Sequence, residues 1–433
     1  MNANEKFGSQ LSRRTLLRRT TAIGAGAAAV WMLAPAGLAA PLGRGSARAT
    51  PPAATPPAGD VPAECLGEEE LAALPDLEPL PPNGVEALLG LFDEYPLVAL
   101  GEDHGIWEIH DFVWSALRHP RFPDKVDALV VEFGNARYQD VIDRYVAGEG
   151  VPRSELVRVW RDTTQGGSRV WDSPIYEQTF AVAREVNRGL PPERRIRVLL
   201  GDPPIDWAGV ERQEDAGRYL EQRDAHYAEV VEREVLAKGH RALLIAGLLH
   251  FVRLPPPPPD NTGPYNPGVV ARLDERAPGR TFVLAFATGA PVALDPERTQ
   301  ERRLATELPV PSVARVAGTW LGASGCLMVA GGQPLRVEDQ VDGVYYVGPG
   351  DTWTMAEPSP FLYAAEPAHF AELRRRHELL SGRPLPLDEP QYFVHGEPDI
   401  YQRGGATYPG GMVVTVGPGT PPAGADASGT PSP

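Results

Sequence analysis

The chain has 433 residues, of which 42% are hydrophobic and 23% are charged, and its formal net charge is -16. These proportions are typical of a globular protein that buries a large core. The negative charge repels the phosphates of nucleic acids and of anionic membranes, so we expect neither as a partner.

The first residues have the pattern of an export signal. Arg13 and Arg14 are followed by residues 22–38, which are rich in alanine and glycine and carry no charge. This pattern is typical of a twin-arginine leader, so we predict that residues 1–49 are a signal recognised by the twin-arginine export machinery. The mature protein would then be periplasmic, held in the cell envelope or extracellular. We expect no stable membrane span in the mature chain, because no stretch of it is long and apolar enough.

The rest of the chain is predicted to hold one folded domain. Residues 50–64 are a linker rich in proline and alanine, residues 65–415 have the mixed composition of a single α/β domain, and residues 416–433 lack aromatic side chains. We expect the last segment to be a disordered tail. The two cysteines, Cys65 and Cys326, could pair in an oxidising compartment.

Strands and helices alternate along the predicted domain. Continuous apolar runs predict buried strands, and apolar residues at helical spacing, ended by proline or glycine, predict helices. Strands are predicted at residues 97–100, 128–133, 196–200, 243–249, 281–287 and 341–347. Helices are predicted at residues 68–74, 84–92, 104–117, 138–147, 153–160, 173–187, 210–238, 269–273 and 367–380. This alternation predicts an α/β fold with a largely parallel central sheet flanked by helices.

Ionisable side chains follow four of these strands. Glu102 and His104 follow the first strand, and Glu132, Asp202 and His250 follow the next three. Ligands bind at the C-terminal ends of the strands in an open parallel sheet, so these side chains are expected to meet in one cleft. Residues two apart in extended backbone point to the same side, which lets Glu102 and His104 face one ligand.

His104 and its neighbours predict acid–base chemistry. A neutral histidine can take a proton from water, and a nearby carboxylate such as Glu102 fixes its tautomer and raises its basicity. Glu108 lies four residues after His104 in the following helix, where it either orients His104 or lies on a solvated face. Glu102 or Asp103 could instead cap that helix. We expect His110 at the surface.

The other candidates also have structural alternatives. Glu132 could form an ion pair with Arg137, Asp202 could make hydrogen bonds in a turn, and His250 could be a buried core residue. As site residues, Asp202 would contact the substrate or position a histidine, and Glu132 would lie at the reaction centre. The chain has no G-x-G-x-x-G, P-loop, H-E-x-x-H or G-x-S-x-G motif, which argues against a nucleotide enzyme, a zincin and a serine hydrolase.

Three short motifs resemble those of one superfamily. They are Gly101-Glu102-x-His104-Gly105, Val130-Val131-Glu132 and Ala246-Gly247-x-x-His250. Their order resembles the superfamily that includes erythromycin esterase-like proteins, ChaN-like haem-binding lipoproteins and Tiki-type metalloproteases. The sequence around residues 171–177 and 202–207 is most similar to that of exported erythromycin esterase-like members.

This resemblance covers residues 97–349 and implies an α/β fold with its active cleft at the strand ends. It also implies hydrolysis of an ester, lactone or amide carbonyl of a small-molecule substrate. By analogy with the esterases, His104 is the general base that activates water. Glu102 and Glu132 orient it or hold a metal, and His250 stabilises or protonates the reacting group.

The spacing of the first motif keeps a second function open. The esterases usually have two residues between the glutamate and the histidine, whereas only Asp103 separates Glu102 from His104. This spacing is nearer to that of the ChaN-like and Tiki-like proteins. It implies that Glu102, His104, Glu132 and His250 could hold a divalent metal, with haem as the lesser alternative. The alternative function is therefore haem or metal binding without turnover.

Overall fold

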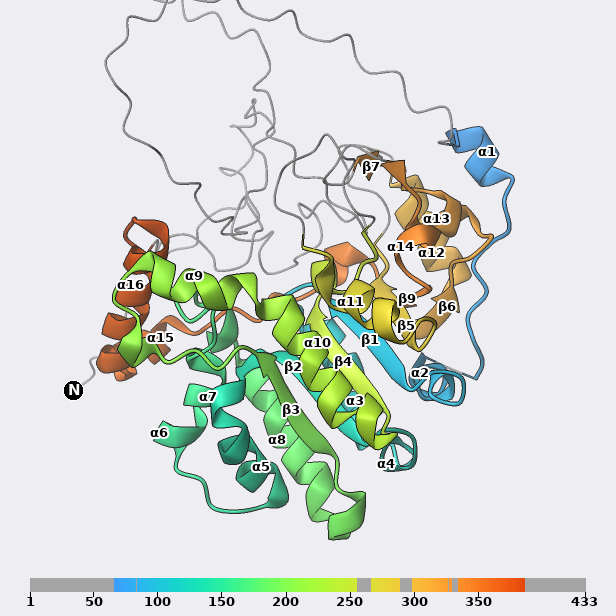
Figure 1. The fold of residues 1–433 in the computed structure, drawn as a ribbon. Coiled ribbons are helices and arrows are strands. Elements are labelled where there is room, and N and C mark those ends of the chain that lie inside the picture. Colours follow the sequence, from blue (N-terminus) through green and yellow to red (C-terminus); the bar gives the residue numbers. More distant parts are fainter. Residues whose placement is uncertain are drawn as a thin grey trace, which may run out of the picture.

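The computed structural model describes residues 66–82, 84–254, 266–288, 298–325, 327–328 and 334–385. The predicted export signal, linker and C-terminal tail lie outside these residues, as do Cys65 and Cys326. A seven-stranded sheet forms the centre of the described part, in the order β3-β2-β4-β1-β5-β9-β6. All neighbouring strands are parallel except β6 and β9, so the predicted α/β fold with a largely parallel sheet is confirmed. Helices flank the sheet (Figure 1).

The strands of this sheet follow the apolar runs of the sequence. They are β1 (Leu97–Glu102), β2 (Ala128–Asn135), β3 (Arg197–Asp202), β4 (Ala242–Gly247), β5 (Thr281–Phe286), β6 (Ser312–Arg315) and β9 (Gly343–Tyr346). Every residue of β1, β2 and β5 is buried, as expected for strands covered on both faces. The antiparallel edge strand β6 was not predicted, because its four residues include only two apolar ones. Strands β7 (Leu327–Met328) and β8 (Pro334–Leu335) form a separate pair.

The helices occupy most of the predicted positions. They are α1 (Glu68–Ala72), α2 (Gly84–Leu91), α3 (Trp107–Arg118), α4 (Phe122–Lys125), α5 (Gln139–Ala147), α6 (Arg153–Leu156), α7 (Arg158–Arg161), α8 (Pro174–Arg188), α9 (Gln213–Glu221), α10 (Arg223–Glu234), α11 (Gly268–Arg276), α12 (Thr299–Glu307), α13 (Trp320–Ala323), α14 (Val337–Gln340), α15 (Pro360–Ala365) and α16 (Pro367–Ser381). Within the described residues, none of them combines the length and the apolar character of a membrane span.

Two helix groups cover opposite faces of the sheet. Phe133 of β2 packs on Tyr176 and Phe180 of α8, whereas the preceding residue, Glu132, contacts Arg223 of α10. Successive strand residues point to opposite faces, so α8 lies on one face and α10 on the other. Helix α3 packs beside α8, and α11 packs beside α10 (Figure 1).

Three predicted boundaries were wrong, and each difference places a functional group. The helix predicted from residue 104 begins at Trp107, because Gly105 adopts a positive φ of 85° and keeps His104 in a turn. The strand predicted to residue 249 ends at Gly247, and residues 248–250 form a 3₁₀ turn, η6 (Leu248–His250). The helix predicted over residues 210–238 breaks at Gln222, so α10 starts at Arg223.

Candidate active site

His104 lies at the C-terminal end of β1 and is held by Glu102 at the end of the same strand. The Nδ1–H of His104 donates a hydrogen bond of 2.9 Å to Oε1 of Glu102. The carboxylate is buried, whereas the His104 side chain is 27% exposed. Since Nδ1 is used by the carboxylate, the other ring nitrogen, Nε2, is the one left to exchange a proton with a ligand.

His110 holds the same carboxylate from the opposite side. Its Nε2 donates to Oε2 of Glu102 at 2.5 Å, and its Nδ1 lies 3.2 Å from the hydroxyl of Thr179 in α8. The expectation that His110 lies at the surface was wrong, because its side chain is fully buried. The reason is its place in α3, where it faces the carboxylate and the aromatic ring of Tyr176. The Tyr176 hydroxyl also lies 3.3 Å from Oε1 of Glu102 and donates to it.

Glu132 is the centre of the second half of the site. It lies in β2, and its Oε2 accepts a hydrogen bond of 2.8 Å from the backbone N–H of Gly247. Its Oε1 is paired with Arg223 at the start of α10 and lies 3.2 Å from Nε2 of His250. His104 approaches from β1, with its Nε2 3.9 Å from Oε2 of Glu132. The alternative pairing of Glu132 with Arg137 does not occur, since Arg137 pairs with Asp206.

His250 is held on both of its ring nitrogens. Its Nδ1–H donates to Asp224 of α10, while Nε2 faces Glu132. Asp224 also accepts a hydrogen bond from the side chain of Asn266. A histidine placed between two carboxylates is stabilised in its protonated form.

Asp202 lies at the end of β3, beside this network. Its carboxylate accepts hydrogen bonds from the backbone N–H of Thr164 at 2.7 Å and from the hydroxyl of Thr164 at 2.5 Å. The Nε of Arg223 lies 3.8 Å from the Asp202 carboxylate, so Arg223 connects Asp202 to Glu132. The turn hydrogen bonds offered as an alternative for Asp202 are replaced by these contacts to residue 164.

Glu108 lies away from this network. Its carboxylate accepts a hydrogen bond of 2.8 Å from the backbone N–H of Thr354. The orienting contact to His104 comes from Glu102 instead. The structure therefore brings together Glu102, His104, Glu132 and His250, joins Asp202 to them through Arg223, and places Glu108 at the segment that follows η7 (Gly350–Thr352).

The pKa values of the site follow from burial opposed by close opposite charges. Burial would raise the pKa of Glu132, but the charges of His250 and Arg223 outweigh it and hold that pKa well below its usual range. Burial would lower the pKa of His250, but Glu132 and Asp224 raise it to about 10. His250 is therefore protonated at neutral pH.

Two further shifts concern His104 and Asp202. Burial opposes protonation of His104, yet the hydrogen bond to Glu102 and the charge of Glu132 raise its pKa above 6.5. Burial raises the pKa of Asp202 to about 7, because Arg223 and Thr164 compensate its lost hydration only in part. The site thus holds a carboxyl group, Asp202, that gains or loses a proton near neutrality, and a histidine, His104, with a raised pKa.

The donor groups of the site do not fit a resident metal ion. Within the described ranges, no three His, Cys, Asp or Glu side chains are arranged to hold one. Both oxygens of Glu102 accept hydrogen bonds from histidines, and both nitrogens of His250 face carboxylates. These four residues, predicted as candidate ligands, are therefore engaged with each other, and we derive no step through a metal or haem.

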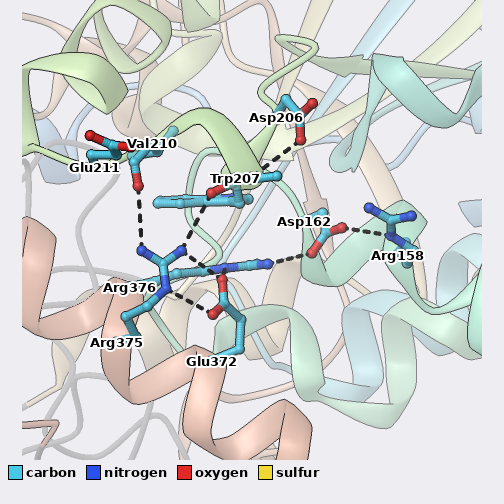
Figure 2. A pocket seen from close by; sticks show the side chains of 10 residues that line it. Arg158, Asp162, Asp206, Trp207, Val210, Glu211, Glu372, Arg375 and Arg376 are labelled. Atoms are coloured by element: carbon cyan, nitrogen blue, oxygen red, sulfur yellow. Dashed lines mark hydrogen bonds and ion pairs between the residues drawn. The ribbon is translucent and has the colours of Figure 1, made fainter.

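A separate hollow of about 610 Å³ lies between the loop after β3 and helix α16 (Figure 2). Its charged groups are paired with one another, as Arg376 with Asp162 and Glu372, and Arg158 with Asp162. The Arg376 guanidinium also stacks on the ring of Trp207, 4.8 Å from its centre. We call this set of ion pairs the α16 junction. None of its residues contacts His104 or Glu132 in the described structure, so it is a structural joint and not the reaction centre.

Sequence reasoning missed five residues of the site. They are His110, Tyr176, Arg223, Asp224 and Asn266. One signal could have found His110: it lies three residues before Val113 and four before Trp114, on the apolar side of its helix. Arg223 and Asp224 carried no such signal, because they lie in a segment where charged residues are common.

The fold and the site together define an α/β protein with two histidines and their carboxylates at the C-terminal ends of neighbouring parallel strands. No protein-family model matches the chain, and no curated protein matches its sequence. Among solved structures it is similar to an erythromycin esterase in its open conformation, at 14% identity and a TM-score of 0.43, over 61% of this chain and 93% of that one.

Two further solved structures show the range of these similarities. A succinoglycan biosynthesis protein is 10% identical, with a TM-score of 0.44, over 63% of this chain and 94% of that one. The haem-binding ChaN of Campylobacter jejuni is 14% identical, with a TM-score of 0.32, over 47% of this chain and 86% of that one.

Proposed function

We propose that this protein is a hydrolase in which His104 activates water for attack on an ester, lactone or amide carbonyl. The observation that carries the proposal is the pairing of His104 Nδ1 with the buried Glu102, which leaves the partly exposed Nε2 as the base. A carboxylate behind a histidine fixes its tautomer and stabilises the imidazolium that forms during the reaction.

Water would be held between His104 and Glu132. Their facing atoms, Nε2 and Oε2, are 3.9 Å apart, a separation that one water molecule hydrogen-bonded to both can bridge. Glu132 is fixed in place by Gly247 and Arg223, so it can orient the water without moving. In the first step the water oxygen bonds to the carbonyl carbon, and its proton passes to Nε2 of His104.

The positive groups of the site would stabilise the charge that develops on the carbonyl oxygen. His250 is protonated at neutral pH and faces the Glu132 carboxylate. Arg223 forms an ion pair with the same carboxylate. Both groups would act through their positive charge, because the N–H groups of His250 are engaged with Glu132 and Asp224 and Arg223 is paired with Glu132. In the second step the carbon–oxygen or carbon–nitrogen bond breaks, and the leaving group takes the proton from His104. The products are a carboxylic acid and an alcohol or amine.

The test is the loss of hydrolysis in His104→Ala. We expect kcat/KM to fall by a factor of roughly 10² to 10⁴ across a panel of p-nitrophenyl esters, lactones and peptide amides, as is usual when a general base is removed. The matched control is His119→Ala at the other end of α3, where the ring pairs with Glu86. Full activity in His104→Ala would overturn the proposal, and a Soret absorbance band with no hydrolysis would replace it with haem binding.

We also propose export by the twin-arginine route, on the basis of the Arg13-Arg14 pair. Replacing both arginines with lysine keeps the positive charge but removes the paired guanidinium groups that define the leader. We expect the doubly substituted protein to stay inside the cell when the chain is expressed in a bacterium with this export system, as measured by fractionation. Unchanged export would contradict this part of the proposal.

A further inference from the structure

Two exposed apolar side chains flank the histidines of the candidate active site. Trp107 is 41% exposed and follows His104 by three residues, and Leu249 is 37% exposed and directly precedes His250. In the described residues only two other large apolar side chains are this exposed, Val310 and Phe361. Single exposed apolar residues are common on protein surfaces, so the position of this pair is the informative feature.

Trp107 and Leu249 lie at the ends of neighbouring strands. β1 and β4 are paired with Glu102 opposite Gly247, so the turn with His104 and the turn with Leu249 leave the sheet side by side. A Cβ atom added at Gly247 would lie only 3.0 Å from Nε2 of His104. The reactive nitrogen is therefore close to the η6 turn, which carries Leu249.

The two side chains are kept exposed by their neighbours. The Trp107 ring rests edge-on against the ring of Trp114, 5.5 Å between centres, and its backbone N–H donates to Thr354. In η6, Leu248 is buried and lies against Gly101, which turns the next residue, Leu249, outward. A third apolar group, the buried ring of Trp171, packs edge-on against His104 at 5.0 Å. An apolar ring therefore packs directly against His104, while the site carboxylates are buried.

We infer that the site takes esters with an extended apolar acyl group, and that Trp107 and Leu249 determine this specificity. The inference rests on the proposed hydrolase function and names its substrate class. An acyl chain lying on Trp107 and Leu249 would remove apolar surface from water beside the scissile carbonyl, which favours longer chains. Binding energy from such a remote, non-reacting part of the substrate holds the carbonyl in position.

The test compares p-nitrophenyl acetate, butyrate and octanoate. We expect the wild-type protein to prefer octanoate over acetate by about 10-fold or more in kcat/KM, since each buried methylene contributes several-fold. Trp107→Ala and Leu249→Ala should each reduce this preference by about 3- to 10-fold. Phe361→Ala is the matched control, because Phe361 is 81% exposed on α15 and leaves the preference unchanged.

A binding measurement separates this inference from the proposed function. Methyl octanoate and methyl acetate are titrated calorimetrically into His104→Ala protein, with and without Trp107→Ala. If Trp107→Ala weakens the binding of methyl octanoate to His104→Ala protein but leaves the binding of methyl acetate unchanged, the apolar subsite is supported even if no ester is hydrolysed. Equal binding of the two esters, or a chain-length preference unaffected by either substitution, overturns it. A change of oligomeric state on Trp107→Ala, with the preference intact, would assign this surface to self-association and also overturn the inference.

Discussion

The α16 junction and the candidate active site both bury several charges, but the ion pairs of the junction use arginine, whereas those of the active site use histidines as well as Arg223. In the junction, Arg376 pairs with Asp162 and Glu372, and Arg158 pairs with Asp162. In the active site, the carboxylates of Glu102 and Asp224 are held by histidines. Arginine keeps its charge at all ordinary pH values, whereas histidine gains and loses a proton near neutrality. The ion pairs of the junction can therefore only hold structural elements together, whereas the histidines of the site can also transfer protons.

The exposed fraction of the charged side chains also differs between the two regions. The side chains of Arg376 and its partner Asp162 are 8% and 12% exposed, whereas those of His104 and His250 are 27% and 21% exposed. A buried ion pair that exchanges nothing with solvent contributes to specificity of the fold. A partly exposed histidine with a buried carboxylate behind it is placed to meet a substrate. The following predictions use this contrast.

The largest effect is expected from Glu102→Gln. The substitution keeps the size of the side chain but removes the charge that His104 and His110 share. We expect kcat/KM for ester hydrolysis to fall by roughly 10²-fold or more, because the base loses its fixed tautomer and the stabilisation of its imidazolium. The measurement is steady-state hydrolysis of a p-nitrophenyl ester. Activity within about 2-fold of wild type would show that the site does not work as a histidine–carboxylate pair.

A substitution in the junction should affect stability and leave catalysis intact. Arg376→Met leaves the buried Asp162 carboxylate without one of its partners, so we expect the free energy of unfolding to fall by about 3 kcal/mol. The change is measured by urea unfolding, and kcat/KM is measured below the unfolding transition. Loss of activity in the fully folded variant would mean that the two regions are coupled.

The pH dependence of activity should report the two site histidines. The base form of His104 is needed, so kcat/KM should rise with pH through its raised pKa, with a midpoint above 6.5. The protonated form of His250 is needed, so kcat/KM should fall again near pH 10. A kcat/KM that does not rise with pH anywhere below the fall near pH 10 would contradict the assignment of His104 as the base.

Asp202 should make stability depend on pH. Its pKa is about 7 in the folded chain and near 3.8 when unfolded, so the folded state binds the proton more tightly. The resulting stabilisation is present below the unfolded pKa and is lost as pH rises to about 7. Asp202→Asn removes this dependence. The difference in the free energy of unfolding between the wild-type and variant proteins should therefore change by roughly 2 to 4 kcal/mol from pH 4 to pH 8. The measurement is urea unfolding at each pH. A free energy of unfolding that changes with pH in the same way in both proteins would contradict the raised pKa of Asp202.

The smallest effect is expected from removing metal ions. The candidate ligands are engaged with one another, so dialysis against EDTA should change kcat/KM by less than about 2-fold. Readdition of zinc or magnesium serves as the control. A loss that zinc restores would show that the site rearranges around a metal.

The sequence was sufficient to predict the sheet and the strand-end acids, because buried parallel strands are continuous apolar runs. Glu102, His104, Glu132 and His250 were found as the ionisable residues that end such runs. Arg223 and Asp224 could not be found in this way, because the break at Gln222 that directs them to the sheet edge has no proline or glycine to mark it. Their roles depend on tertiary contacts with β2 and η6.

Gly247 allows a control protein that differs from the wild type by one methyl group. Its hydrogen atom faces Nε2 of His104, where a Cβ would stand 3.0 Å away. Alanine at this position would occupy the approach to the base without altering any ionisable group. Such a variant would keep the electrostatic field of the site and obstruct only the approach to His104. It offers a way to trap intact substrates for structure determination, with every charged side chain still present.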